Sequence, residues 1–260
     1  MRLTQRRRQR QRSTQGAAAG RRVALLLLAA ALSASAEPWS LGSFRLCSSV
    51  RLPWVDQNAS GAAYVPESNT LWVVRNEPPG LFEYDTSGTR LLRWLDISWL
   101  KDTEDLAYIG GGRLAVVEEG PGGGIHVFDI ASGRHVESFN VANPRTQEYG
   151  NEGLSYDPGS GIYYVAQEKW PRRILAVRPN GDGSSQWWNV VDGDAAYRGV
   201  GDIAAVAYVP QLGQVFVLSQ ESNRVLRSTM EGRVLQELWV TGSQPEPNEM
   251  AIYKVDDCGA

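Results

Sequence analysis

The chain has 260 residues, of which 42% are hydrophobic and 21% are charged, and its formal net charge is −3. Eight of its 26 basic residues and none of its 29 acidic residues fall within residues 1–36, so the rest of the chain carries a net charge of −11. Proteins that bind nucleic acid need a basic surface for the phosphates, and this acidic body therefore excludes nucleic acid as the expected partner.

The N-terminal 36 residues read as a targeting segment. Arginines 21 and 22 precede the apolar run "VALLLLAAALSASA", which ends in the small-residue triplet Ala34-Ser35-Ala36. This run of about 14 residues is shorter than the roughly 18–20 that a membrane-spanning helix needs. The pattern predicts a signal peptide cleaved near Ala36 and an extracytoplasmic mature protein. Two alternatives stay open: an uncleaved membrane anchor, or a transit peptide followed by a twin-arginine signal that directs the protein to an organelle lumen.

Residues 37–260 repeat one short phrase and form one predicted domain. The phrase ends in Tyr in "SGAAY", "EDLAY", "EGLSY" and "AAVAY", with a weaker fifth copy in "EMAIY". The tyrosines lie 44 to 52 residues apart, at positions 64, 108, 156, 208 and 253. Periods of this size are typical of propeller blades with four strands each. We therefore expect an all-β propeller whose blades start near residues 58, 102, 150 and 202.

Each repeat contains short β-branched or alternating runs between Gly-containing turns. The first repeat has "NTLWVVRN", "GLFEYDTSG" and "TRLLRWLDI" after its Tyr, and the second has "RLAVVEE", "GGIHVFDIASG" and "RHVESFNV". Such runs, separated by Asp-, Asn- or Ser-Gly turns, predict consecutive antiparallel hairpins.

Several long segments resemble the SdiA-regulated family of bacterial proteins. They are "NASGAAYVPESNTLWVVRNEPPGLFEYDTSG", "DTEDLAYIGGGRLAVVEE", "NEGLSYDPGSGIYYVAQEKWPRRILAV" and "VLSQESNRVLRSTMEGRVLQEL". The resemblance implies a five-bladed β-propeller and an envelope protein with an N-terminal membrane segment, and it implies no established reaction. Only four repeats are complete here. We expect an incomplete last blade, with a partial blade at 243–258 and a closing strand at 43–52.

The two cysteines lie near the two ends of the mature chain. Closure of the ring by the segment 43–52 would bring Cys47 and Cys258 into one blade, and an oxidising compartment would then favour a disulfide between them. Two free thiols are the alternative. Two cysteines and two histidines, His126 and His135, are too few for a Cys/His zinc site, so the sequence predicts none.

The candidate site is the mouth of the central channel, where the first strand of each blade starts. The repeat places Glu104 and Glu152 there, preceded by Asp102 in the second blade, with Ser60 and Ala204 in the equivalent positions of the other blades. The ends of the second strands reach the same face and add further candidate ligands: Asn76, Glu118, Glu119, Glu168 and Glu221.

Convergent carboxylate and amide oxygens are ligands that Ca²⁺ prefers, so Ca²⁺ is the candidate ion, with Glu104 and Glu152 as its ligands. A non-metal ligand, or a purely structural use of the acids, are the other interpretations. The sequence therefore predicts an exported module that binds a small molecule or a protein through an acidic top face. The alternative is a Ca²⁺-dependent hydrolase of an ester, lactone or phosphate. The sequence offers no support for a Ser/His/Asp arrangement.

Overall fold

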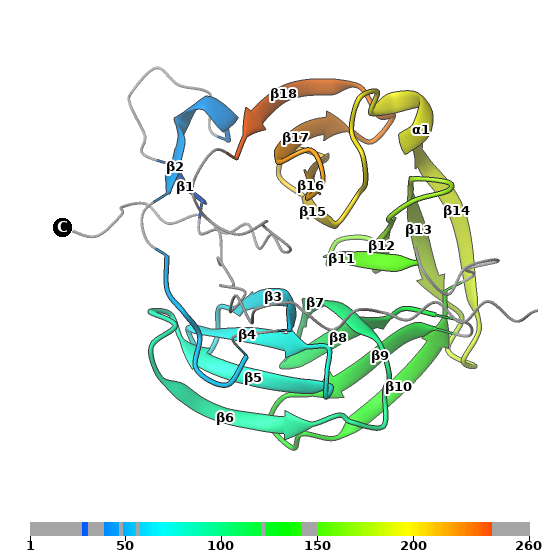
Figure 1. Cartoon of the computed structure of the whole chain (residues 1–260). Helices are drawn as coiled ribbons and strands as arrows, with labels where there is room; N and C mark the ends of the chain where they lie inside the picture. The colour runs from blue at the N-terminus through cyan, green and yellow to red at the C-terminus, as the bar shows by residue number, and fades with distance from the viewer. Residues whose placement is uncertain are drawn as a thin grey trace, which may run out of the picture.

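The computed structural model describes residues 28–30, 39–46, 49–55, 58–120, 123–141 and 150–240, and in them the chain forms four antiparallel four-stranded sheets. The sheets follow one another around a centre as propeller blades, with the first strand of each blade innermost (Figure 1). Blade 1 contains β3 (Ala59–Val65), β4 (Thr70–Arg75), β5 (Gly80–Asp85) and β6 (Leu91–Asp96). Blade 2 contains β7 (Thr103–Gly110), β8 (Arg113–Glu118), β9 (Gly124–Asp129) and β10 (His135–Asn140).

The second half of the chain repeats this plan. Blade 3 contains β11 (Asn151–Asp157), β12 (Ile162–Gln167), β13 (Arg173–Pro179) and β14 (Ser185–Asp192), followed by the one-turn helix α1 (Gly193–Ala196). Blade 4 contains β15 (Ala205–Val209), β16 (Gln214–Ser219), β17 (Arg224–Thr229) and β18 (Val234–Trp239). In the described part of the chain, no helix is long and apolar enough to cross a membrane.

The number of blades differs from the prediction. The described residues form four blades and not five. Each of the four repeats supplies all four strands of its own blade, and no strand of a repeat joins another sheet. The expected partial blade at 243–258 lies outside the described residues. Within the expected closing strand 43–52, β2 (Phe44–Leu46) pairs with β1 (Leu28–Ala30) in a separate two-stranded sheet and joins none of the four blades.

Burial explains why the middle strands are continuous apolar runs and the outer strands alternate. The second strand of an inner blade has a neighbouring sheet on both faces, and in β12 of blade 3 five consecutive residues are buried. The outer strand β6 has solvent on one face, and its residues alternate between half-buried and exposed. A side-chain period of two on a sheet with one solvated face produces this alternation. Separate apolar clusters fill the spaces between blades 1 and 2, blades 2 and 3, and blades 3 and 4.

The N-terminal segment covers the outward faces of the first and last blades. Leu41 and Phe44 pack into the apolar cluster of blade 4, and the Leu41 amide donates to Gln236 Oε1 at 2.8 Å. Leu52 and Val55 are buried in the cluster of blade 1. These faces have no further blade packed against them in the described structure, so residues 39–46 and 49–55 shield apolar surface that would otherwise face water.

Candidate functional site: the acidic mouth of the channel

Antiparallel pairing brings the predicted site residues to one end of the channel. Thr103 at the start of β7 lies opposite Glu118 at the end of β8, and Asn151 at the start of β11 lies opposite Gln167 at the end of β12. Starts of first strands and ends of second strands therefore share one face of the propeller. We call the acidic residues gathered there the acidic mouth: Asp102, Glu104, Glu119, Glu152, Glu168, Asp202 and Glu221.

Glu104 and Glu152 each lie in a β-bulge, outside the regular pairing of their strands. The register shifts between Thr103 and Asp105 in β7 and between Asn151 and Gly153 in β11, so Glu104 and Glu152 are each the extra residue. Blade 1 has the same shift around Ser60. A bulge redirects the side chain of the unpaired residue, and bulges are frequent next to functional sites. The repeated phrase thus encodes a repeated bulge.

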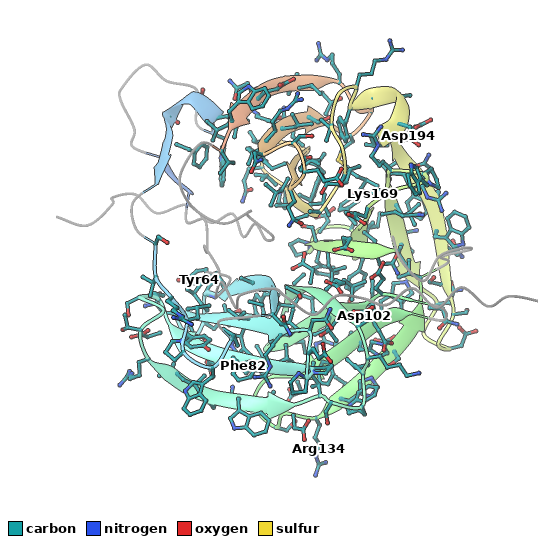
Figure 2. All side chains as sticks on the ribbon, in the orientation of Figure 1. Tyr64, Phe82, Asp102, Arg134, Lys169 and Asp194 are labelled. Carbon is teal, nitrogen blue, oxygen red and sulfur yellow. The ribbon has the colours of Figure 1, made fainter. Side chains whose placement is uncertain are left out.

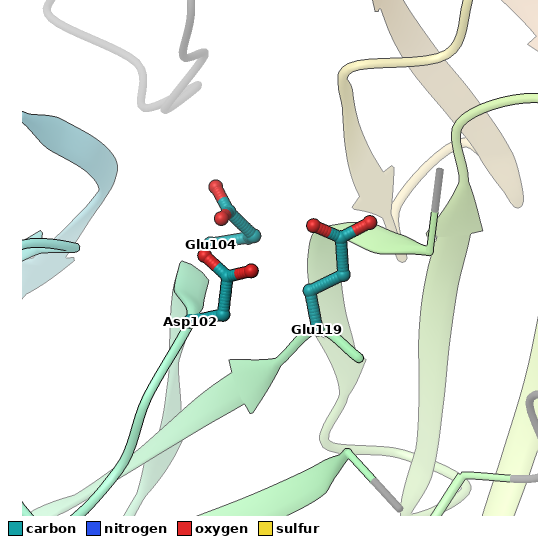
Figure 3. A group of neighbouring side chains, drawn as sticks. All are labelled: Asp102, Glu104 and Glu119. Carbon is teal, nitrogen blue, oxygen red and sulfur yellow. The ribbon is translucent and has the colours of Figure 1, made fainter. Parts of the chain in front are cut away.

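Asp102, Glu104 and Glu119 form the tightest group of the mouth. One carboxylate oxygen from each lies within 4.8 Å of the others (Figure 3). Asn76 Nδ2 from blade 1 donates to Asp102 Oδ1 and to Glu104 Oε1, both at 2.7 Å, and the Gly150 amide donates to Glu119 Oε1. We call these four side chains, together with Glu152, the blade 2 half of the mouth.

The pKa values of this half are raised by burial and by mutual repulsion. Burial, followed by the charge of Glu152, raises the pKa of Glu104 to about 10. The pKa of Glu152 lies well above its usual range, first because of burial and then because of Glu119 and Glu168. Burial raises the pKa of Glu119 to about 6, although its bond from Gly150 opposes this shift. The largest charges that shift the pKa values of Glu104 and Glu152 are those of other carboxylates, so mutual repulsion dominates the electrostatics of these two groups.

The other half of the mouth contains its own cation. We call it the blade 4 half, and it consists of Glu168, Lys169, Asp202 and Glu221. Lys169 Nζ lies 2.9 Å from Glu168 Oε1 and 2.9 Å from Glu221 Oε1. The side chains of Lys169 and Glu168 are each only 15% exposed. The buried Asp202 accepts hydrogen bonds from Ser219 Oγ at 2.5 Å and from the Glu221 amide at 3.2 Å. Asp102 and Lys169 both lie toward the centre of the ring, whereas Arg134 lies at its outer rim (Figure 2).

The structure separates one predicted ligand from the rest. Glu118 faces away from the acidic mouth: its Oε1 accepts the Lys101 amide at 2.8 Å, and its Oε2 lies 3.2 Å from His126 Nε2. Successive side chains of a strand point to opposite faces, which explains why Glu118 and Glu119 diverge. Cys47 and Cys258, the predicted disulfide, lie outside the described residues.

Sequence reasoning missed a hydrogen-bonded chain on blade 2. His126 Nδ1 lies 2.8 Å from Ser138 Oγ, and His135 Nε2 lies 2.7 Å from the same oxygen. Because His126 also contacts Glu118, a serine, a histidine and a carboxylate are linked here although the sequence indicated no such arrangement. Burial lowers the pKa of His126. The pairing register of β9 and β10 would have revealed this contact, because His126 and Ser138 are directly opposite partners in the two strands.

The repeated tyrosines line a cavity toward the other end of the first strands. This cavity has a volume of about 230 Å³, and its lining includes Tyr64, Tyr108, Tyr156 and Tyr208. The buried Asp105 also lines it and accepts the amides of Leu154 and Leu106, each at 2.7 Å. Burial raises the pKa of Asp105 well above its usual range. Its bond to Leu154 joins blade 2 to blade 3, so this carboxyl group has a structural role.

Comparison with known proteins agrees with the propeller architecture. A family model described as SdiA-regulated matches residues 43–248. Among solved structures, a chain of a nidogen/laminin complex is similar with a TM-score of 0.56 and 13% identity, over 81% of this chain and 73% of that one. A protein of unknown function from Bacteroides caccae has a TM-score of 0.50 and 14% identity, over 72% of this chain and 63% of that one. Identities this low indicate a shared fold and carry no further argument.

Proposed function

We propose that this chain, which belongs to the SdiA-regulated family, binds a ligand through the acidic mouth and holds Ca²⁺ there. Its β-propeller fold favours a role as a binding module. The observation that carries the proposal is the charge imbalance of the blade 2 half. Three carboxylates approach within 4.8 Å of one another, and the largest charges acting on Glu104 and Glu152 are negative.

The chemistry of the donors fits a hard cation. Asp102, Glu104 and Glu119 would supply carboxylate oxygens, and Asn76 would supply its carbonyl oxygen after rotation of the amide. Burial and the charges of neighbouring carboxylates raise the pKa of Glu152, and a cation at the mouth would offset the repulsion from those carboxylates. Ca²⁺ takes six to eight oxygen ligands in flexible geometries and keeps some water, so an open mouth suits it. A bound ion would offset the repulsion that raises these pKa values.

The test is a titration of the full chain with CaCl₂, followed by calorimetry and by thermal unfolding against EDTA. We expect a saturable heat and a higher melting temperature, since an ion at 100 times its dissociation constant stabilises the native state by about 2.7 kcal/mol. Glu104→Gln and Glu152→Gln should each weaken binding at least tenfold. Glu231→Gln is the matched control, because Glu231 is an exposed acid on the turn between β17 and β18. No heat and no shift, or equal weakening by the control, would refute the proposal.

One observation favours the hydrolase as a second candidate. If Asp102, Glu104 and Glu119 hold Ca²⁺, coordination positions remain for water and for a substrate oxygen, which the ion would polarise. A hydrolase would turn over p-nitrophenyl acetate, p-nitrophenyl phosphate or a simple lactone in a Ca²⁺-dependent manner, and Glu119→Gln would abolish that turnover. Ca²⁺ binding without turnover of any of the three would leave the binding module as the function.

A further inference from the structure

The two histidines of the chain are nine residues apart in sequence and converge on one oxygen atom. His126 comes from β9 and His135 from the start of β10, and their ring nitrogens lie 2.8 and 2.7 Å from Ser138 Oγ. Their ring centroids are 6.0 Å apart. This cluster lies on blade 2 and is built from residues that do not belong to the acidic mouth.

A carboxylate fixes which nitrogen of His126 carries the proton. Glu118 Oε2 can only accept, so the His126 Nε2 at 3.2 Å is the donor. Glu118 is itself held in place by the Lys101 amide, which donates to its other oxygen at 2.8 Å. The Nδ1 lone pair of His126 therefore points at Ser138. A histidine that donates one ring N–H to a carboxylate and presents its other nitrogen is the arrangement that metal-ligating histidines adopt.

Trp99 supports both rings and leaves the cluster open to solvent. Its ring meets His126 edge-on with centroids 5.4 Å apart and meets His135 edge-on with centroids 5.0 Å apart. Trp99 is 55% exposed and His135 is exposed, whereas the His126 side chain is only 12% exposed. The imidazole of His126 is thus largely buried and oriented, and that of His135 is accessible to water.

The spacing of the rings suits coordination to one ion. A metal about 2.0–2.1 Å from a nitrogen of each ring would place the two centroids roughly 5–6 Å apart. The observed centroids, 6.0 Å apart, are close to this arrangement before any side chain moves. Imidazole nitrogens favour Zn²⁺, Cu²⁺ and Ni²⁺ over Ca²⁺, so this cluster and the acidic mouth would select different ions.

We propose that His126 Nδ1 and His135 Nε2 form a binding site for a divalent transition-metal ion, with Ser138 Oγ and water as further ligands. Glu118 is a positioning residue that acts through His126. Cu²⁺ should bind more tightly than Zn²⁺, as expected for nitrogen ligands. The site keeps open positions for water or a second ligand because the protein supplies only part of the coordination sphere.

The test titrates the full, untagged chain with CuSO₄ or ZnSO₄, in a Cys47→Ser, Cys258→Ser background that removes competing thiols. We expect one equivalent to bind and the electron paramagnetic resonance spectrum of Cu²⁺ to show coupling to two nitrogens. His135→Ala and His126→Gln should each weaken Cu²⁺ binding more than tenfold. Glu118→Gln should weaken it about tenfold, because loss of a carboxylate that orients a ligating histidine typically costs that much affinity. Glu231→Gln is the control and should leave it unchanged.

Two results would overturn this site. One is an absence of saturable Cu²⁺ binding, and the other is binding that survives His135→Ala with the same spectrum. Thermal unfolding of each variant checks that it folds, and the exposed position of His135 makes its substitution the safer of the two. Glu104→Gln should weaken Ca²⁺ binding at the acidic mouth at least tenfold and leave Cu²⁺ binding intact, so failure of either proposal can be recognised without the other.

Discussion

The two halves of the acidic mouth use equivalent strand ends and balance their charges differently. In the blade 4 half, Lys169 bridges Glu168 and Glu221, and the buried Asp202 is satisfied by a hydroxyl and an amide. In the blade 2 half, Asn76 supplies neutral hydrogen bonds, and the largest charges acting on Glu104 are those of other carboxylates. A carboxylate cluster is stable when a cation accompanies it, and an internal lysine does for one half what an external ion would do for the other. Repeated blades can therefore keep the same strand geometry and differ in the group that balances the charge of their carboxylates.

The largest expected effect comes from removing a repelled carboxyl. Without Ca²⁺ at pH 7, Glu104→Gln should raise the free energy of unfolding by up to about 3 kcal/mol, because keeping this group protonated at a pH well above the ordinary glutamate pKa of 4.5 costs about that much. Gln retains the oxygen that accepts from Asn76. Urea unfolding in EDTA measures the change. A less stable variant under these conditions would show that the blade 2 half is not strained.

Glu104 also determines whether the free energy of unfolding rises or falls with pH. The pKa of Glu104 is about 10 in the folded protein, so between pH 4.5 and that value the native state holds a proton that the unfolded state has lost. The free energy of unfolding of the Ca²⁺-free protein should therefore fall as pH rises from 5 to 8. The slope should be shallower in Glu104→Gln and in the presence of Ca²⁺. Equal slopes in all three would contradict the assignment.

Removal of the internal cation should make the two halves alike. Lys169→Met leaves Glu168 and Glu221 without their shared partner and should cost about 2 kcal/mol of unfolding free energy, less than a fully buried pair because the Glu221 side chain is 53% exposed. Lys101→Met is the control, since Lys101 is an exposed lysine at the edge of blade 2. If charge balance is the difference between the halves, calorimetry should detect a second equivalent of Ca²⁺ in the variant. Binding of only one equivalent would show that charge balance is not what distinguishes the two halves.

A smaller effect is expected from the buried acid of the blade 4 half. Asp202→Asn keeps one acceptor oxygen but turns an NH₂ group toward Ser219 or the Glu221 amide, so about 1 kcal/mol should be lost. Thermal unfolding measures this loss. Ca²⁺ affinity of the blade 2 half should stay within twofold of the parent, and a larger change would mean that the two halves act as one site.

The smallest effect should come from the exposed end of the lysine bridge. Glu221→Gln removes one of the two carboxylates of Lys169, but the Glu221 side chain is half exposed and an ion pair of this kind contributes about 0.5 kcal/mol. The change in urea midpoint should be near the limit of measurement at physiological salt. A loss as large as that of Lys169→Met would mean that Glu221 carries the bridge.

Much of the propeller could be predicted from the repeated phrase. The period identified four-stranded blades, and the first strands begin at residues 59, 103, 151 and 205, close to the predicted 58, 102, 150 and 202. The number of blades could not be read in the same way. A repeat predicts its own strands from local hydrophobic pattern, but how many sheets surround the centre depends on packing between distant segments, such as Leu41 on blade 4 and Leu52 on blade 1.

The candidate site was predictable as a set of positions and not as a set of contacts. Glu104, Glu119 and Glu152 were placed at the channel mouth because strand ends share a face. Glu118 was placed there too, and the alternation of side chains along β8 turns it toward His126 instead. The meeting of His126 with His135 depends on the pairing of β9 with β10, so counting histidines in the sequence could not reveal it.

The amino-acid sequence was enough to predict a propeller of four-stranded blades, although not the number of blades, because hydrophobic period and turn residues act over a few neighbours. It also placed acids at the starts and ends of strands. The folded structure was needed to show that Lys169 meets Glu221 and that Glu104 meets Glu152, since the members of each of these pairs come from different blades. Charge balance depends on distances between segments tens of residues apart, and those distances exist only after the blades have packed.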